Sequence, residues 1–236
     1  MKTILLICLT LPLFASVYKA KVQPYEQVTL SAEVSGRIVK LDQKDELKML
    51  DKKVLVIDHA LQSQELKNTK AKLKLLQNQI AIKQGQYNRI KNLQGQSRTT
   101  KERYKSELLN YKMQAMDLKN AIARLQDIIS KKEISLHQQY LKQLYVKEGA
   151  FVAPGSRLMD VEDQSASRIV IFIDAKDRTD IEKKTILING KNDHSYVIEK
   201  VGDSTDAQYL SSYRVELVKS GKAHFGEIVT VEIKDK

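Results

Sequence analysis

A long proline-free stretch with a regular apolar spacing constrains the fold of this 236-residue chain more than any other feature. Proline is absent from Tyr25 to Ala153, and an interior proline costs a helix about 3 kcal/mol. Two runs inside this stretch alternate apolar spacings of three and four, which is the heptad pattern of a coiled coil. The first run is Leu66, Thr69, Leu73, Leu76, Ile80, Lys83, Tyr87 and Ile90, and the second is Tyr104, Leu108, Tyr111, Ala115, Leu118, Ile122, Leu125, Ile129, Lys132 and Leu136.

The segment between the two runs predicts a turn. Residues 93–100 interrupt the spacing with glycine and hydroxyl residues, and Thr99-Thr100-Lys101-Glu102 matches a capping box at which we expect the second helix to begin. Two arms of about 35 residues, each rising about 1.5 Å per residue, make a hairpin about 50 Å long. We therefore predict an antiparallel coiled-coil hairpin over residues 59–136.

The charge of the chain lies on this hairpin. The formal net charge is +11, and the segment from His59 to Lys142 holds 17 Lys and Arg against 6 Asp and Glu, so the remainder is neutral. A basic coiled coil that binds nucleic acid is therefore one hypothesis. The charged faces carry no interleaved aromatic residues, which weakens it.

The N-terminus predicts export. Met1-Lys2-Thr3 precedes eleven apolar residues, Ile4 to Phe14, which matches the core of a secretory signal and is far shorter than the ~20 residues of a membrane-spanning helix. We predict a cleaved signal peptide within residues 1–20, with the cut after Ala15 or Ala20. An uncleaved N-terminal anchor is the competing interpretation.

Several classes of site have no support in the sequence. One Cys allows no disulfide framework and no cysteine-based zinc site, and the nine glycines form neither a dinucleotide fingerprint nor a phosphate loop. His59 and His137 flank the hairpin without further ligands, and His194 and His224 stand near no nucleophile and carboxylate arrangement. We predict no metal, no cofactor, no catalytic residues and no enzymatic activity.

The segments that flank the hairpin are strand-like. Residues 28–41 and 54–58 precede it, and residues 140–149 and 151–161 follow it, each rich in β-branched residues and bounded by turn residues. Because a hairpin returns the chain to its starting point, the flanking halves, 21–58 and 137–165, must lie side by side. We expect them to complete one β domain.

These halves carry a resemblance to a known family. The sequence LSAEVSGRIVKL…DKKVLVID, followed after the hairpin by YLKQLYVKEGAFVAPGSRLMDVED, resembles the split biotinyl-lipoyl-like domain of HlyD-type periplasmic adaptor proteins, also called membrane fusion proteins. The turn from Val146 to Gly155 is its strongest element. The resemblance implies an α+β fold in which the hairpin is inserted in the lipoyl-like domain and a small β-barrel domain follows over residues 166–236. Its expected strands are 169–173, 186–188, 196–201, 213–218 and 228–233.

Two details of the lipoyl-like halves differ from the family pattern or need interpretation. Asp45-Glu46 stands where the family usually has a glycine-containing turn, so we expect a different loop there. Asp51-Lys52 is similar to the acceptor pair of true lipoyl domains. In the adaptors this fold has lost its prosthetic group, so the resemblance implies no modification of Lys52.

The resemblance also implies a function and a partner-binding site. Adaptors link an inner-membrane transporter of the RND or ABC type to a TolC-type outer-membrane channel and assemble as homo-oligomers in the periplasm, associated with the inner membrane. In the family an Arg, a Leu four residues on and a Ser seven residues later contact the channel, and this chain has Arg89, Leu93 and Thr100 at that spacing. We therefore expect these three residues to bind the channel.

Two alternatives and several details stay open. A structural coiled-coil protein of the envelope without a transport role would share the predicted fold, and the nucleic-acid hypothesis remains as the weaker alternative. The sequence does not identify the exported small molecule or ion, the energy source of the transporter, the number of copies or the transporter-facing residues.

Overall fold

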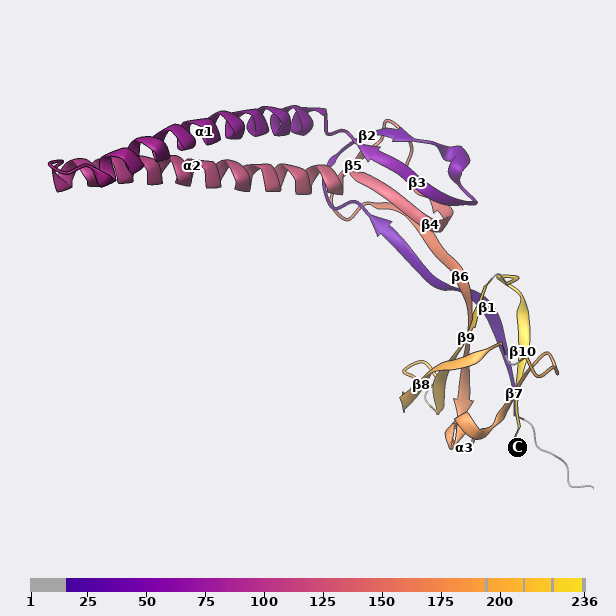
Figure 1. The fold of residues 1–236 in the computed structure, drawn as a ribbon. Helices are drawn as coiled ribbons and strands as arrows, with labels where there is room; N and C mark the ends of the chain where they lie inside the picture. The colour runs from indigo at the N-terminus through magenta and orange to yellow at the C-terminus, as the bar shows by residue number, and fades with distance from the viewer. Residues whose placement is uncertain (1–15, 194, 210, 222, 235–236) are drawn as a thin grey trace, which may run out of the picture. The chain divides into compact units, whose positions relative to one another are not determined.

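The computed structural model describes residues 16–193, 195–209, 211–221 and 223–234, so the apolar run of the predicted signal peptide lies outside the described residues. Two long helices and ten strands follow one another along the chain (Figure 1). The strands are β1 (Ser16–Ser31), β2 (Gly36–Leu41), β3 (Lys48–Ile57), β4 (Glu133–Leu144), β5 (Phe151–Val152), β6 (Arg157–Asp174), β7 (Thr185–Ile188), β8 (Val197–Thr205), β9 (Ser212–Ser220) and β10 (Ile228–Lys234). The helices are α1 (Ala60–Asn92), α2 (Arg98–Lys131) and the short α3 (Ala175–Arg178), with 3-10 turns η1 (Gln43–Asp45) and η2 (Ile181–Lys183).

The described chain divides into two compact units. The hairpin unit comprises residues 29–137 and 143–159, and the C-terminal unit comprises residues 16–28, 138–142 and 160–234. The predicted domain boundaries differ from this division, because residues 21–28, 138–142 and 160–165 belong with the C-terminal strands. The boundaries fall inside the strands β1, β4 and β6, where no linker composition marks them.

The hairpin unit combines the helices with a small antiparallel sheet in the order β5-β2-β3-β4. The chain leaves β3 into α1 and returns from α2 into β4, and the amide of Ile57 donates to the carbonyl of Lys132 at 2.8 Å. Leu55, Ile57 and Leu136 are fully buried between the strands. Figure 1 shows α1 and α2 running side by side away from this sheet.

The segment predicted as one strand, 28–41, is two strands with a break between Ser31 and Gly36. At this break the amide of Ala32 donates to the carbonyl of Ser156, and the carbonyl of Ala32 accepts from the amide of Gly155, both at 2.8 Å. The backbone here therefore pairs with the end of the turn that follows β5 and does not continue the strand. A side chain at Gly36 would meet the Ile57 side chain at 2.5 Å. Only glycine allows this close approach of β2 to β3.

The loop at Asp45-Glu46 takes a different form from a glycine turn. Asp42 accepts from the amide of Lys44 and begins η1, and Leu47 then adopts a left-handed conformation with φ of 61°. The Glu46 carboxylate accepts from the amide of Leu144 at 2.9 Å. A carboxylate therefore ties this loop to β4.

Both ends of the second helix differ from the prediction. The N-cap is Ser97, not Thr99, because the Ser97 hydroxyl accepts from the amide of Thr100. The helix ends at Lys131, so Lys132 is the C-cap and Leu136 lies in β4. Leu136 shares the 3-4 spacing, but its burial among the strands determines its conformation.

The C-terminal unit is built from strands in the order β7-β10-β1-β6-β9-β8. All five strands expected after residue 166 are present, together with β1, which the sequence reasoning had not assigned to this unit. Its core is formed by Ala20, Val22, Ile169, Ile171, Ile173, Ile181, Ile188, Val215, Leu217, Val229, Val231 and Ile233. The α+β class is confirmed, and closure of these strands into a barrel stays a prediction.

None of the helices in the described part of the chain has the length and apolar composition needed to cross a lipid bilayer.

Candidate partner-binding tip of the helical hairpin

The two predicted heptad runs meet along the seam between α1 and α2. Every run position from Leu66 to Ile90 and from Tyr104 to Ile129 is buried or half-buried, while the flanking positions are mostly exposed. Leu76, Leu108, Ala115 and Leu125 are the most deeply buried of them. The apolar spacing therefore determines which faces of the helices meet.

A polar pair sits within this apolar seam. Lys83 occupies a heptad position, and its Nζ donates to Glu107 Oε2 at 2.8 Å and lies 5.9 Å from the Tyr111 ring centre. The hydrogen bond with Glu107 raises the pKa of Lys83, and the same bond lowers the pKa of Glu107. Because a polar residue at a seam position pairs in one register only, this contact fixes how α1 and α2 align.

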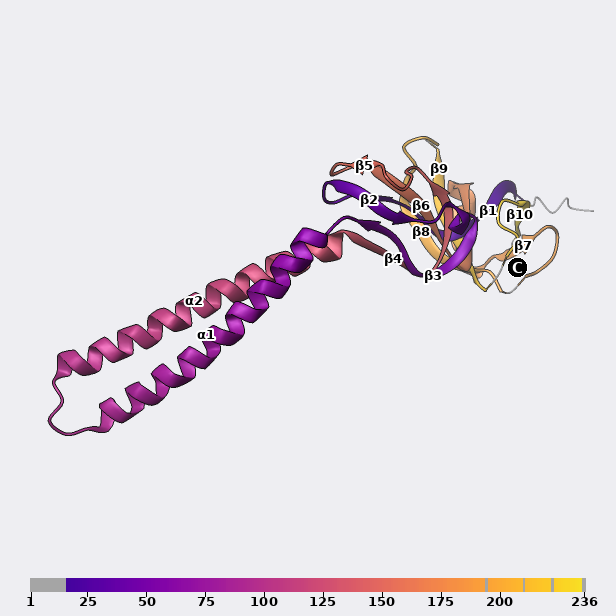
Figure 2. The ribbon, with the colours of Figure 1, turned by 90° about the horizontal axis from the view of Figure 1, so that it is seen from above.

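The turn at the tip follows from three local signals (Figure 2). The amide of Leu93 donates to the carbonyl of Ile90 and ends α1, and Gly95 adopts φ of +83°, a conformation that favours glycine. Ser97 then caps α2, with its Oγ 3.1 Å from the amide of Thr100. The chain reverses within five residues, 93–97.

All three predicted contact residues lie at this tip. Arg89 is exposed in the last turn of α1, Leu93 is 49% exposed just beyond it, and Thr100 is half-buried in the first turn of α2. The Thr100 hydroxyl lies 2.9 Å from Ser97 Oγ, so the cap already engages it. Among the described residues no carboxylate pairs with Arg89, which leaves its guanidinium facing solvent.

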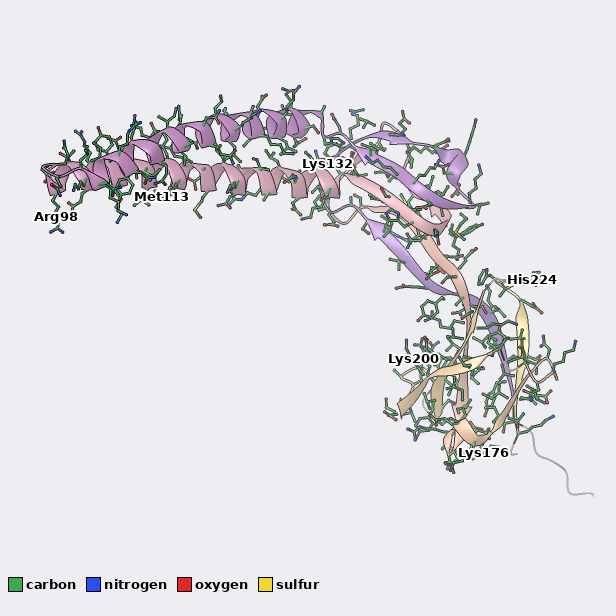
Figure 3. All side chains as sticks on the ribbon, viewed as in Figure 1. Arg98, Met113, Lys132, Lys176, Lys200 and His224 are labelled. Atoms are coloured by element: carbon green, nitrogen blue, oxygen red, sulfur yellow. The ribbon has the colours of Figure 1, made fainter. Side chains whose placement is uncertain are left out.

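The tip is more basic than the predicted residues alone indicate. Lys91 follows Arg89 at the end of α1, and Arg98 and Lys101 lie in the first turn of α2, where there is no acidic residue. Figure 3 shows Arg98 at the far end of the hairpin. Arg98 pairs with Glu102 at 2.8 Å.

Positive charge at the start of α2 opposes the helix dipole, which favours acidic residues at a helix N-terminus. The ion pair with Glu102 gives Arg98 a local role, whereas Lys101 opposes the dipole.

Each helix also carries a second stripe that the sequence analysis missed. The outer stripe of α1 is Gln64, Asn68, Ala71, Leu75, Asn78 and Ile82, and the outer stripe of α2 is Ser106, Leu109, Met113, Met116, Asn120 and Ala123. All twelve residues are exposed and none is charged, although the hairpin is the basic part of the chain. Leu75, Ile82, Met113 and Met116 each expose more than 60% of their surface. The sequence signal that could have revealed them is the lack of charged residues at positions spaced three and four apart.

The two outer stripes point to different sides of the hairpin. Leu75 shares a groove with Gln114 and Asp117, which directly precede seam positions, as Leu75 itself does. Leu109 and Met116 directly follow seam positions, and helix geometry turns them to the other side. In Figure 3 Met113 projects from α2 away from α1.

Polar contacts tie together the root of the hairpin. Glu133 accepts from Lys53 Nζ at 2.6 Å, which is the main cause of its lowered pKa, and lies 3.1 Å from His59 Nε2. His59 Nδ1 lies 2.8 Å from Ser63 Oγ. His137, the other histidine that flanks the hairpin, pairs with Asp51 instead. The two histidines are therefore not brought together, and no group of three metal-ligating side chains occurs in the described residues.

A buried lysine joins the two helices at the same place. Lys132 Nζ donates to the Asp58 carbonyl at 2.7 Å and to Gln62 Oε1 at 3.3 Å (Figure 3 labels Lys132). Lys52, which resembles the acceptor lysine of true lipoyl domains, lies within β3 and pairs with Asp45 at 2.7 Å. Its ammonium group is therefore committed to a structural contact.

Comparison with known proteins identifies the fold through structure alone. No family model matches the sequence, and no curated protein matches it. A chimera of MacA that contains the Pseudomonas aeruginosa MexA hairpin domain matches 95% of this chain and 82% of its own, with a TM-score of 0.58 and 22% identity. A membrane fusion protein from Streptococcus pneumoniae matches 94% of this chain and 99% of its own, with a TM-score of 0.63 and 9% identity.

The chain has the membrane fusion protein fold. MacA from Actinobacillus actinomycetemcomitans agrees, covering 94% of this chain and 78% of its own with a TM-score of 0.55 and 20% identity. The membrane fusion protein fold confirms the resemblance that the split lipoyl-like halves predicted. The match extends through both units of the described chain.

Proposed function

We propose that this chain is a periplasmic adaptor that links an inner-membrane transporter to a TolC-type outer-membrane channel for the export of small molecules or ions. The observation that carries the proposal is the exposed basic tip on a membrane-fusion-protein hairpin. The adaptor performs no chemistry in this proposal. Its contribution is geometry, and the transporter supplies the energy.

At the tip, recognition combines one directional contact with one apolar contact. The exposed Arg89 guanidinium donates to carboxylates or carbonyls at the ends of the channel helices, a geometry that arginine forms with two parallel hydrogen bonds. Leu93 packs between helices of the channel. Thr100 offers its hydroxyl once the channel replaces the Ser97 contact.

Lateral assembly uses the outer stripes. Exposed apolar side chains at heptad spacing on both helices favour packing against another helix, and the two stripes face different sides. The Lys83–Glu107 and Lys112–Gln84 contacts place Ile82 and Leu109 at similar levels along the hairpin. The outer stripe of α1 in one copy therefore meets the outer stripe of α2 in the next, and repetition of this contact builds a closed ring.

The remaining parts of the chain serve the base of the assembly. The lipoyl-like strands of neighbouring copies stack, and loops of residues 166–236 face the transporter. In this proposal the strands of the C-terminal unit close into the small barrel that follows the lipoyl-like domain in adaptors. An envelope rod without a transport role is the second candidate, and the nucleic-acid hypothesis is the least supported because the uncharged stripes interrupt the basic faces.

Site-specific photocrosslinking tests the channel contact. A photoreactive residue at position 89, 93 or 100 should capture an outer-membrane channel in intact cells, whereas the same residue at the exposed Lys67 near the root should not. Arg89→Glu should abolish capture from position 93 without changing the amount of protein in the envelope. Equal capture from position 67 would contradict a specific tip contact.

Charge substitution tests the lateral assembly. Met113→Glu places a carboxylate in the outer stripe of α2 and should shift the oligomer toward monomer in analytical ultracentrifugation while leaving the helical content unchanged. Lys119→Glu changes charge on the same helix outside the stripe and is the matched control. Normal export in a deletion strain would favour the rod without a transport role.

A further inference from the structure

Strand β1 begins at Ser16, the first described residue, and its first residues alternate between the core and solvent. Val17, Lys19 and Lys21 are exposed, whereas Ser16 and Tyr18 are half-buried and Ala20 is buried. Ala20 and Val22 belong to the core of the C-terminal unit, and Tyr18 packs against it. The chain therefore needs these residues for folding.

This strand is interior to its sheet. It lies between β10 and β6, and its register with β10 runs from Ser16↔Ile233 to Lys21↔Ile228. A cut after Ala20 would remove all of these pairs except the last and expose an unpaired edge of β10. Of the two cleavage positions that the sequence offers, the one after Ala20 therefore conflicts with the fold.

A buried carboxylate faces the beginning of the strand. Asp177 is 7% exposed, and its Oδ2 accepts from the Tyr18 hydroxyl at 2.7 Å while its Oδ1 accepts from Lys184 Nζ at 3.3 Å. Ser16 lies on the same side of β1 as Tyr18, two residues before it, and both are half-buried. Burial acts to raise the pKa of Asp177, but the hydrogen bonds from Ser16, Tyr18 and Lys184 outweigh it and lower the pKa.

Two carboxylates act on the Tyr18 hydroxyl. Asp177 and Asp174 are both close enough to act on the Tyr18 hydroxyl, and its pKa rises to about 12 through burial, the Asp177 hydrogen bond and both charges, although a backbone hydrogen bond at Asp174 lowers it. Lys184 is the cation that pairs with Asp177. A positive group beside Ser16 would therefore face two carboxylates, Asp177 and Asp174.

We propose that a signal peptidase cuts the peptide bond between Ala15 and Ser16 and that the new amino group of Ser16 binds the Asp177 carboxylate. Water supplies hydroxyl to the Ala15 carbonyl carbon and hydrogen to the Ser16 nitrogen, which takes a second proton from solvent and becomes an ammonium. Ala15 provides the small residue immediately before the cut, whereas the third-from-last position holds Leu13, or the larger Tyr18 for a cut after Ala20. The Ser16 nitrogen begins the strand whose next inward-facing residue, Tyr18, already donates to Asp177.

This inference requires export, which the proposed function also requires, but no channel or transporter contact. A chain that starts at Ser16 and fails to crosslink to a channel would contradict the proposed function and leave the processing site intact.

Mass measurement of the N-terminus tests the cut. The full chain is expressed with a functional export pathway, and the envelope fraction should yield a protein that begins with Ser16. A protein that begins with Lys21, or one that retains Met1, would overturn the proposal. Ala15→Leu should make the precursor accumulate, whereas Ala20→Val, which blocks the other position, should leave the Ser16 start unchanged.

A double-mutant cycle tests the contact with Asp177. The chain that begins at Ser16 is prepared with a free or an acetylated amino group, each with Asp177 and with Asp177→Asn. Acetylation should lower the melting temperature of the chain with Asp177 and leave that of the Asp177→Asn variant unchanged, because an uncharged amide then replaces the carboxylate. An equal effect of acetylation in both backgrounds would show that the ammonium does not bind Asp177.

A chemical measurement covers the case in which Asp177→Asn does not fold. The amino group of the Ser16-starting chain should react with an amine-selective reagent about tenfold more slowly than a peptide with the same first residues, which corresponds to a rise of one unit in the pKa of the amine. Equal reactivity would overturn the contact.

Discussion

The helical hairpin and the C-terminal unit bury their apolar residues in different ways. Along helices of 33 and 34 residues the hairpin has four deeply buried apolar residues, Leu76, Leu108, Ala115 and Leu125, all in one seam. The C-terminal unit has twelve buried apolar residues in one core. Two of them come from β1, and the other ten lie between Ile169 and Ile233. The seam is one line of contacts between two helices, whereas the core lies among several strands.

This difference bears on the outer stripes of the hairpin. A two-helix hairpin has no second layer, so the apolar residues of the outer stripes remain exposed in the described part of the chain. In the proposed assembly, neighbouring copies cover these stripes. The predictions below test this contrast through substitutions in each region.

The largest effect is expected in the C-terminal core. Leu217 is fully buried there, so Leu217→Ala should reduce the free energy of unfolding by about 3–5 kcal/mol, because enclosed strands relax little around a cavity. Denaturant unfolding followed by circular dichroism measures the change. A loss below about 1 kcal/mol would mean that this core is as adaptable as the seam.

The same substitution in the seam should cost less. Leu108 is only 3% exposed, yet Leu108→Ala should reduce stability by about 2 kcal/mol, because the two helices can approach and water can reach the site. Hydrogen exchange should locate the loss in α1 and α2 and leave β9 unaffected. A cost equal to that of Leu217→Ala would remove the proposed contrast.

The cap of α2 should contribute less again. Ser97→Ala removes the acceptor for the Thr100 amide and should cost about 1 kcal/mol. Faster hydrogen exchange should be confined to the first turn of α2. Ser97→Asp keeps an acceptor and is the control, so an equal loss in both variants would contradict the role of the cap.

The pH dependence of the seam is the smallest expected effect. The pKa of Glu107 is lowered by its hydrogen bond to Lys83, so this pair stabilises the hairpin fully above the ordinary carboxyl pKa of 4.5, and the contribution is lost as pH falls through the lowered value. The raised pKa of Lys83 predicts a second loss above pH 10.5. Glu107→Gln should abolish the acid step in the helical signal, and persistence of that step would assign it to other carboxylates.

The sequence was most informative where one periodicity determines the structure. The 3-4 spacing identified the seam residues from Leu66 to Ile129, and the turn chemistry around Gly95 located the tip. Its failures occur where tertiary contacts override a local pattern. Leu136 continues the spacing but is buried among strands, and Thr99 matches a cap motif that Ser97 fulfils.

Other features had no local signal at all. The first residues of β1 carry no local strand signal, because they pair with β10, which lies more than 200 residues away in sequence. The predicted signal peptide therefore included them. The Lys83–Glu107 contact depends on the register of two helices, which a heptad pattern does not specify. The positions of Arg89, Leu93 and Thr100 at the tip could be predicted, whereas the surrounding basic residues gain meaning only from the helix ends at which they lie.

The hydrogen bond between Ile57 and Lys132 closes the base of the hairpin, so the length of the hairpin is independent of everything below it. Removal of seven residues from each helix, in register, would preserve both the seam and the base and shorten the arm by about 10 Å. The number of heptads in the two helices therefore determines the distance between the tip and the base of the hairpin.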